Sequence, residues 1–172
     1  LIDTTLYSIA CRPSKLHFVD FGSGKGRVVF HAALNGCGHT VGIEVEDVLH
    51  QVALRNRSQR ALQHVAEKIE LLNQDAASYQ VPHTDCVLNF YNPVSSAVFA
   101  CVFENAQATH REFDNKMYIA FQESRNEPAH SQTNNIAILE SADWLRSVDI
   151  RFPSVWSKFL LSHYRIKIFE TR

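Results

Sequence analysis

The sequence predicts an α/β fold in which helices cover both faces of a doubly wound, mostly parallel sheet. Three observations support this class: short apolar runs recur along the chain, helix-like segments alternate with them, and a glycine-rich turn follows the first run. With 45% hydrophobic and 20% charged residues, the chain can form a complete hydrophobic core. Its length of 172 residues predicts one domain over residues 1–172.

Each element follows from a local pattern. The predicted strands are short apolar or β-branched runs, at residues 16–21, 39–44, 68–73, 84–91 and 116–123. The predicted helices carry apolar residues three to four positions apart, at residues 27–34, 47–66, 94–106 and 140–148. A further helix is expected within residues 1–15, where it would cover the sheet.

The C-terminal region is expected to close the sheet. Residues 124–135 are polar and are predicted to form a loop. Two β-rich runs follow, at residues 150–152 and 159–170, and they leave no room for a helix between them. Residues 149–172 are therefore predicted to form a terminal β-hairpin that adds an antiparallel strand.

The stretch DFGSGKGR places Gly22, Gly24 and Gly26 directly after the first predicted strand. Glycine is used where the backbone turns sharply or a ligand comes close. A phosphate-binding P-loop is excluded because the stretch lacks a G-K-S/T triplet. A dinucleotide site, and with it a nicotinamide-dependent oxidoreductase, is disfavoured because Arg27 stands where the third glycine of G-x-G-x-x-G belongs. The remaining interpretation is a loop that wraps an adenosyl amino acid.

A carboxylate lies at or just after the end of each of the first three predicted strands. Asp20 could meet the ammonium of an adenosyl amino acid, and Glu44 could accept hydrogen bonds from both ribose hydroxyls. Asp75 could accept a hydrogen bond from the adenine amino group. An acid at a strand end can instead cap a helix or face solvent. Three such acids beside the glycine loop favour a nucleoside site.

These stretches resemble the class I S-adenosylmethionine-dependent methyltransferases. The resemblance covers about residues 15–125 and is carried by FVDFGSGKGRVV, VGIEVE, LLNQDAA and CVLNFYNPV. Within the class, the loop is similar to that of a bacterial group of methyltransferases and to that of the non-SET histone-lysine methyltransferases. The resemblance implies a Rossmann-like sheet of seven strands in the order 3-2-1-4-5-7-6, with strand 7 antiparallel, and S-adenosyl-L-methionine as cofactor. The residues implied to bind this cofactor are Asp20, Gly22, Ser23, Gly24, Gly26, Glu44, Val45, Asp75, Ala76 and Asn89.

The string NFYNPV, residues 89–94, lies where amino-group methyltransferases carry an N/D-P-P-Y/F/W motif. Asn92 and Pro93 match its first half, and the two residues after them depart from it. The resemblance implies that the Asn92 side chain and the Pro93 carbonyl orient a nitrogen acceptor. Phe90 or Tyr91 would then support the reacting methyl group. The alternative is a turn that ends the strand, because proline cannot continue the ladder and asparagine favours turns.

The resulting prediction is a methyltransferase whose acceptor is a nitrogen, in a protein lysine or another amine. The alternative is a non-catalytic, methyltransferase-like binding module that supports a partner protein.

A net charge of −1 gives no support to a non-specific nucleic-acid binder, so a protein or small-molecule acceptor is favoured. The four cysteines lack zinc-site spacing, which predicts no metal and reduced thiols in a cytoplasmic, intracellular protein. No apolar run long enough for a membrane span is present, so no membrane partner is expected.

Overall fold

The computed structural model describes residues 2–9, 12–91, 95–124, 133–154 and 164–172. The strands are β1 (His17–Phe21), β2 (His39–Glu44), β3 (Ile69–Asn73), β4 (Cys86–Tyr91), β5 (Met117–Ser124), β6 (Leu145–Val148) and β7 (Tyr164–Thr171). The α-helices are α1 (Ile2–Ser8), α2 (Arg27–Leu34), α3 (Asp47–Arg57), α4 (Ser96–Phe113) and α5 (Thr133–Ser141). Short 3₁₀ turns are η1 (Pro13–Lys15), η2 (Arg60–Leu62), η3 (Ala66–Lys68) and η4 (Ala76–Ser78).

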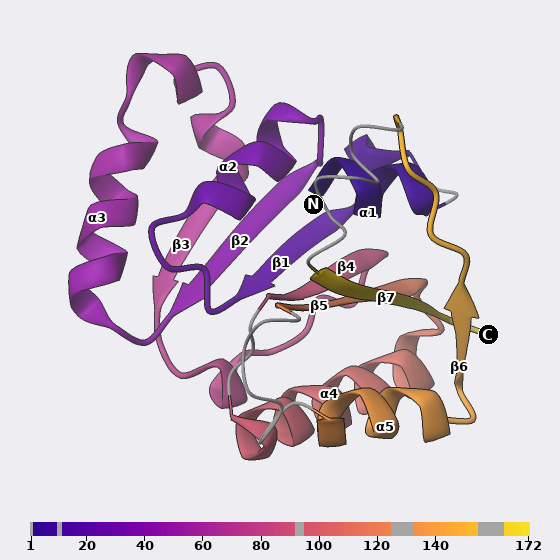
Figure 1. Ribbon diagram of the computed structural model, residues 1–172. Helices are drawn as coiled ribbons and strands as arrows, with labels where there is room; N and C mark the ends of the chain where they lie inside the picture. Colours follow the sequence, from indigo (N-terminus) through magenta and orange to yellow (C-terminus); the bar gives the residue numbers. More distant parts are fainter. Residues whose placement is uncertain (1, 10–11, 92–94, 125–132, 155–163) are drawn as a thin grey trace.

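The described strands form one seven-stranded sheet of order β3-β2-β1-β4-β5-β7-β6. Strands β1 to β5 run parallel to one another, whereas β7 is antiparallel to both of its neighbours, β5 and β6. Helices lie on both faces of this sheet (Figure 1). The predicted α/β class, the strand order and the antiparallel seventh strand are confirmed.

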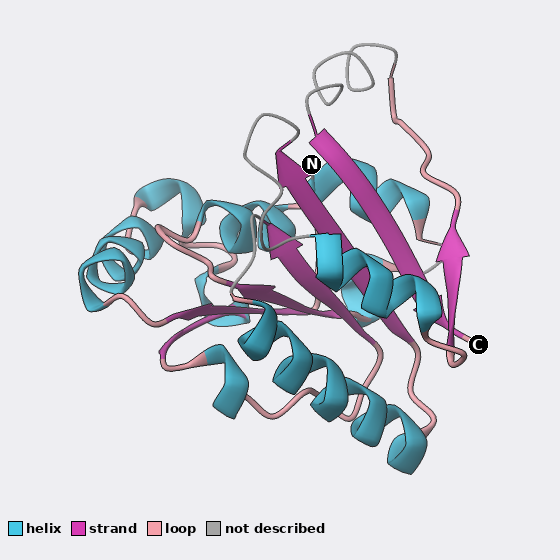
Figure 2. Ribbon diagram, turned by 60° about the horizontal axis from the view of Figure 1, so that its bottom comes forward, coloured by secondary structure: helices cyan, strands magenta, loops and turns pink. Residues whose placement is uncertain are grey.

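The two faces of the sheet are covered by different helices. Helices α1, α2 and α3 lie on one face, and α4 and α5 lie on the other (Figures 1 and 2). Successive residues of β1 belong to different core clusters: Phe18 packs on the α1 face, and Val19 and Phe21 pack on the α4 face. The central strands are therefore apolar on both sides, as is typical of parallel sheets.

Two helices differ in length from their predicted ranges. Helix α3 ends at Arg57, and the rest of the predicted helix 47–66 forms the turns η2 and η3. The extended backbone of Gln59, with φ −66° and ψ 145°, interrupts the helical path there. Helix α4 continues beyond the predicted residue 106 and ends at Phe113, where the left-handed Asp114, with a φ of +51°, caps it.

The C-terminal region differs most from the prediction. Helix α5 occupies the end of the predicted loop 124–135 and the residues after it, because Ile136 and Leu139 fill the core against α4. Strand β6 lies inside the predicted helix 140–148, and residues 150–152 form no strand. The predicted hairpin pairing therefore joins β7 to residues 145–148, through partners such as Leu145 and Thr171.

Helix α1 lies within residues 1–15, where a covering helix was expected. Leu6 and Ile9 pack with the core cluster of that face. The assignment of residues 1–172 to one domain stays a prediction. Among the described residues, no helix combines the length and apolar character that crossing a membrane requires.

Candidate active site

The loop between β1 and α2 bends through glycines in the left-handed region. Gly22, Gly24 and Gly26 have φ values of +76°, +55° and +81°. The N–H groups of Gly22 and Ser23 both donate to the Ile43 carbonyl at 2.9 Å, which ties the loop to β2. A side chain in this backbone region is strained at any of the three glycine positions.

The three glycines have different surroundings. A Cβ atom at Gly22 or Gly24 would meet no atom within 4 Å, so both face open space. A Cβ atom at Gly26 would lie 2.4 Å from the Phe30 ring. Local packing therefore explains the glycine at position 26, whereas open space at positions 22 and 24 leaves room for a ligand against the backbone.

Glu44, the last residue of β2, is 7% exposed and holds the glycine loop. Its Oε2 accepts from the Gly24 N–H at 2.7 Å, and its Oε1 accepts from the Glu46 N–H at 2.9 Å. The Asn73 side chain donates to the carbonyl oxygens of Glu44 and Val45, at 2.8 and 3.2 Å, and fixes the turn after β2. Because a carboxylate offers about four acceptor positions, Glu44 can still accept hydrogen bonds from a ligand.

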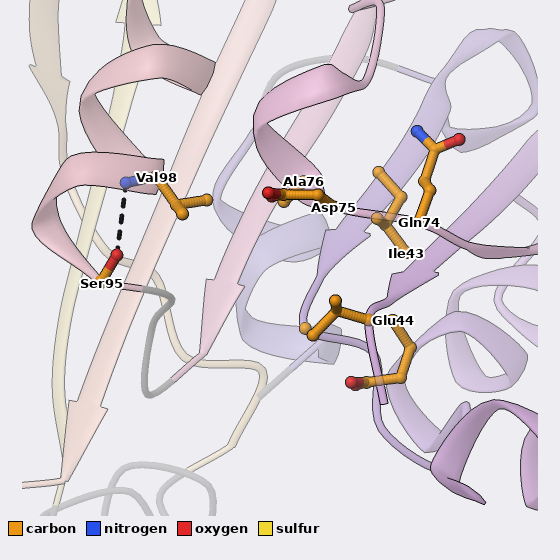
Figure 3. Close-up of a pocket in the computed structure, with 9 residues that line it drawn as sticks. Ile43, Glu44, Gln74, Asp75, Ala76, Ser95 and Val98 are labelled. Carbon is orange, nitrogen blue, oxygen red and sulfur yellow. Dashed lines mark hydrogen bonds between the residues drawn. The ribbon is translucent and has the colours of Figure 1, made fainter. Parts of the chain in front are cut away.

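A cavity of about 190 Å³ opens beside Glu44. Its lining residues come from the ends of β1, β2 and β3 and the start of α4: Gly22, Ile43, Glu44, Val45, Gln74, Asp75, Ala76, Ser95 and Val98. Figure 3 shows the Glu44 carboxylate on one side of the cavity and Val98 on the other. An apolar slot with a carboxylate at one end fits a flat base attached to a sugar.

Five of the residues predicted to bind the cofactor line the cavity: Gly22, Glu44, Val45, Asp75 and Ala76. It also contains residues that the sequence reasoning missed: Ile43, Gln74, Ser95 and Val98. The side chain of Ser95 caps α4 by accepting from the Val98 N–H at 3.4 Å. A serine just before an apolar helix is a recognisable N-cap signal, and it could have placed the start of α4 at this wall.

Asp75 is exposed and lies at the rim, where it caps η4. Its Oδ1 accepts from the Ala77 N–H at 2.9 Å, so the capping alternative considered for strand-end acids is realised here. The next residue, Ala76, is buried and closes the cavity wall. Asp75 thus combines a local structural role with a position at the cavity.

Asp20 and Asn89 form a buried pair behind the glycine loop. They are register partners on β1 and β4, and the Asn89 Nδ2 donates to the Asp20 Oδ1 at 2.7 Å. Burial raises the pKa of Asp20 to about 7; the Asn89 hydrogen bond opposes this shift and the nearby Glu44 charge adds to it. Among the described residues, no group donates a hydrogen bond to the Asp20 Oδ2. A cation placed there would favour the ionised carboxylate and lower its pKa.

Two other predicted residues, Ser23 and Tyr91, lie in the described part of the chain. Ser23 is buried, and its Oγ would lie 2.9 Å from a Cβ atom at Gly42. Tyr91 is the last residue of β4, with its ring centroid 6.0 Å from that of Tyr164. Asn92 and Pro93, both predicted to orient the acceptor, lie outside the described residues.

Comparison with known structures places the fold among methyltransferases. A ribosomal protein L11 methylase from Lactobacillus delbrueckii subsp. bulgaricus has a TM-score of 0.62 at 15% identity, covering 99% of this chain and 76% of the other. An RNA methyltransferase from Salinibacter ruber, in complex with S-adenosyl-L-homocysteine, has a TM-score of 0.56 at 18% identity, covering 99% and 88%. A precorrin-6y C5,15-methyltransferase from Geobacter metallireducens GS-15 has a TM-score of 0.64 at 12% identity, covering 99% and 87%. At these identities the likeness shows the fold alone.

The family comparison reaches further. No curated protein matches the chain. Residues 2–89, about half of the chain, match the family model described as histone methylation protein DOT1. The matched range contains the glycine loop, Glu44, Asp75 and the buried pair of Asp20 and Asn89. The chain therefore belongs to the DOT1 family, and it is a methyltransferase whose cofactor is S-adenosyl-L-methionine.

Proposed function

We propose that this methyltransferase acts on an amine nitrogen, and specifically on the side chain of a lysine in a protein. The observation that carries the proposal is the Asn92-Pro93 pair, which directly follows Tyr91 at the end of β4. In a parallel sheet, ligands bind at the carboxyl ends of the strands. The family match supports a protein acceptor, since the family description names histone methylation.

For the cofactor, we assign the nucleoside part to the cavity. Glu44 accepts hydrogen bonds from the ribose hydroxyls with the acceptor positions that Gly24 and Glu46 leave open. The adenine lies between Val45 and Val98, and Asp75 accepts from its amino group at the rim. The fit is supported by the open space at Gly22 and by the apolar cavity walls.

The amino-acid part of the cofactor is assigned to Asp20. The carboxylate carries an acceptor oxygen, Oδ2, to which no described residue donates. An ammonium at this position forms an ion pair in a buried setting, where Coulomb attraction is stronger than in water. This pairing offsets the burial that raises the pKa of Asp20 in the absence of a ligand.

The chemistry requires a neutral acceptor amine. When bound, S-adenosylmethionine supplies a methyl group on a positively charged sulfur, and the sulfur keeps the bonding electron pair when the methyl leaves. A lysine ammonium has no lone pair, so the acceptor nitrogen first loses one proton to solvent and then forms the new bond with its lone pair. We assign the Asn92 side-chain oxygen and the Pro93 carbonyl to accept the remaining N–H groups and orient the lone pair. Tyr91 supplies an aromatic face beside the reacting methyl.

The fold does not decide the class of acceptor. The structural neighbours are named for a ribosomal protein, an RNA and a precorrin as acceptors. A protein is favoured over nucleic acid because the net charge of this chain is −1, and nucleic-acid binders usually carry a basic excess.

The test is transfer of a radiolabelled methyl group into a cell extract. The extract is then separated into protein, nucleic acid and small molecules, and labelled protein is hydrolysed for amino-acid analysis. The expected result is label in protein as methyl-lysine, lost with Asn92→Ala. The matched control Asn35→Ala changes an exposed asparagine that caps the C-terminal end of α2 and should leave transfer intact. Label confined to RNA or to small molecules would contradict the lysine assignment.

A further inference from the structure

A chain of buried hydrogen bonds runs from Asp20 to the N-terminal helix. Asn89 donates to Asp20 through Nδ2, and its own Oδ1 accepts from the Gln122 Nε2 at 3.3 Å. The same Gln122 nitrogen donates to the Thr5 Oγ1 at 3.2 Å. All four side chains are at most 2% exposed, and they come from β1, β4, β5 and α1. We call these four side chains the buried relay.

The relay fixes the orientation of the Asn89 amide. The Gln122 nitrogen has two hydrogens, one for Asn89 and one for Thr5, so it presents donors only. With Gln122 in this orientation, Asn89 turns its oxygen toward Gln122 and its nitrogen toward Asp20. A reversed amide would place two acceptors together at Asp20 and two donors together at Gln122, and buried contacts of that kind are costly.

We propose that Gln122 and Thr5 are positioning residues of the cofactor site, which hold Asn89 in the orientation that keeps Asp20 available to the cofactor ammonium. This inference rests on the proposed role of Asp20. Neither residue lies in the cavity lining, and both act through Asn89. The role explains why polar side chains interrupt an otherwise apolar core between β4, β5 and α1.

The relay affects the ionisation of Asp20. Its hydrogen bond from Asn89 opposes the rise in pKa that burial causes, and Glu44 is the charged residue that adds to the rise. If Asn89 rotates away, the pKa of Asp20 rises further, and a smaller fraction is ionised at neutral pH. Because an ammonium pairs only with the ionised form, affinity for the cofactor should then require a higher pH.

The relay also connects helix α1 to the site. Besides Thr5, α1 is held by Ser8, whose Oγ accepts from the Arg151 N–H at 2.9 Å. A helix of seven residues is not stable alone in water, so these tertiary contacts determine its stability. Cofactor that pairs with Asp20 should therefore slow amide hydrogen exchange in α1.

Two ligands distinguish an effect on the ammonium position at Asp20 from an effect on the rest of the cofactor site. S-adenosylmethionine carries the ammonium, whereas 5′-methylthioadenosine keeps the nucleoside and lacks the amino-acid part. Binding of both is measured by calorimetry between pH 6 and pH 8 for the wild type, Thr5→Val, Thr5→Ser and Gln122→Met. The matched control is Thr40→Val, which removes an equally buried hydroxyl that donates to the Lys68 carbonyl at 3.2 Å, outside the relay.

In Thr5→Val and Gln122→Met, we expect at least fivefold weaker binding of S-adenosylmethionine at pH 7, with its pH midpoint at least half a unit higher. Binding of 5′-methylthioadenosine should stay within twofold, Thr5→Ser should restore the wild-type profile, and Thr40→Val should match the wild type for both ligands. Equal losses of affinity for both ligands, or no loss for either, would overturn the proposed positioning role of Gln122 and Thr5. Loss of the fold in Gln122→Met would leave the decision to the Thr5 variants. If the wild type binds neither ligand, the proposed cofactor site itself is wrong.

Discussion

Replacing Asp20 by asparagine should stabilise the ligand-free protein while weakening cofactor binding. Burial raises the pKa of this carboxyl from 3.8 to about 7, so the folded state holds its proton more tightly than the unfolded chain. Below the unfolded pKa both states are protonated and no penalty exists. As pH rises from about 4 to about 7 the folded state is progressively penalised, and above 7 the penalty is constant.

The magnitude follows from the size of the pKa change. At about 1.4 kcal/mol per pKa unit, ionising Asp20 lowers the free energy of unfolding by up to about 4 kcal/mol at pH 8. Asp20→Asn removes this penalty and keeps the oxygen that accepts from Asn89. We expect the variant to be more stable than the wild type at pH 8, by an amount that shrinks toward pH 4.

Urea unfolding of both proteins at several pH values measures this difference directly. The control Asp143→Asn changes an exposed carboxyl and should alter stability by less than about 0.5 kcal/mol at every pH. Calorimetry should show at least tenfold weaker S-adenosylmethionine binding for Asp20→Asn. A variant that is no more stable at pH 8 than at pH 5, relative to the wild type, would refute the argument from burial.

Other changes probe the rest of the site. Glu44→Ala removes the carboxylate that holds the loop and faces the cavity, so calorimetry should show about 10- to 100-fold weaker cofactor binding; unchanged binding contradicts its ligand role. Gly26→Ala should lower the free energy of unfolding by about 2–4 kcal/mol through its left-handed backbone and its clash with Phe30. Gly36 also has a left-handed backbone but open space around it, so Gly36→Ala should lower the free energy of unfolding by only about 1 kcal/mol in the same urea titration. Equal losses of stability in the two variants would refute the clash with Phe30. Asn92→Ala should lower kcat about 100-fold and change the cofactor dissociation constant less than threefold; a changed affinity with unchanged kcat removes Asn92 from catalysis.

The sequence predicted the parallel half of the sheet well, because buried parallel strands are continuous apolar runs. His17–Phe21 and Cys86–Tyr91 lie within runs of this kind. The sequence did not predict β6, in which four residues form an edge strand. Leu145 is buried there, and the next two residues are exposed. So short a pattern cannot be told from one turn of helix, and only pairing with β7 defines it. The burial of Ile136 against α4 likewise depends on tertiary contacts.

The candidate site was predicted where local signals mark it. Gly22 and Asp75 each follow a predicted strand, Glu44 is the last residue of one, and all three line the cavity. Val98 and Gln122 were missed because their roles depend on which strands become neighbours, and strand order is not a local property of the sequence. The separation between Thr5 and Gln122, 117 positions along the chain, shows why no local pattern could have predicted the relay.

The proposed function depends on the nucleoside of the cofactor lying in the cavity beside Glu44. A crystal structure with S-adenosyl-L-homocysteine would show whether it does. We expect the ribose hydroxyls within hydrogen-bond distance of the Glu44 carboxylate, the base between Val45 and Val98, and the ammonium beside the Asp20 Oδ2. A ligand bound elsewhere, or one whose sugar makes no contact with Glu44, would contradict it.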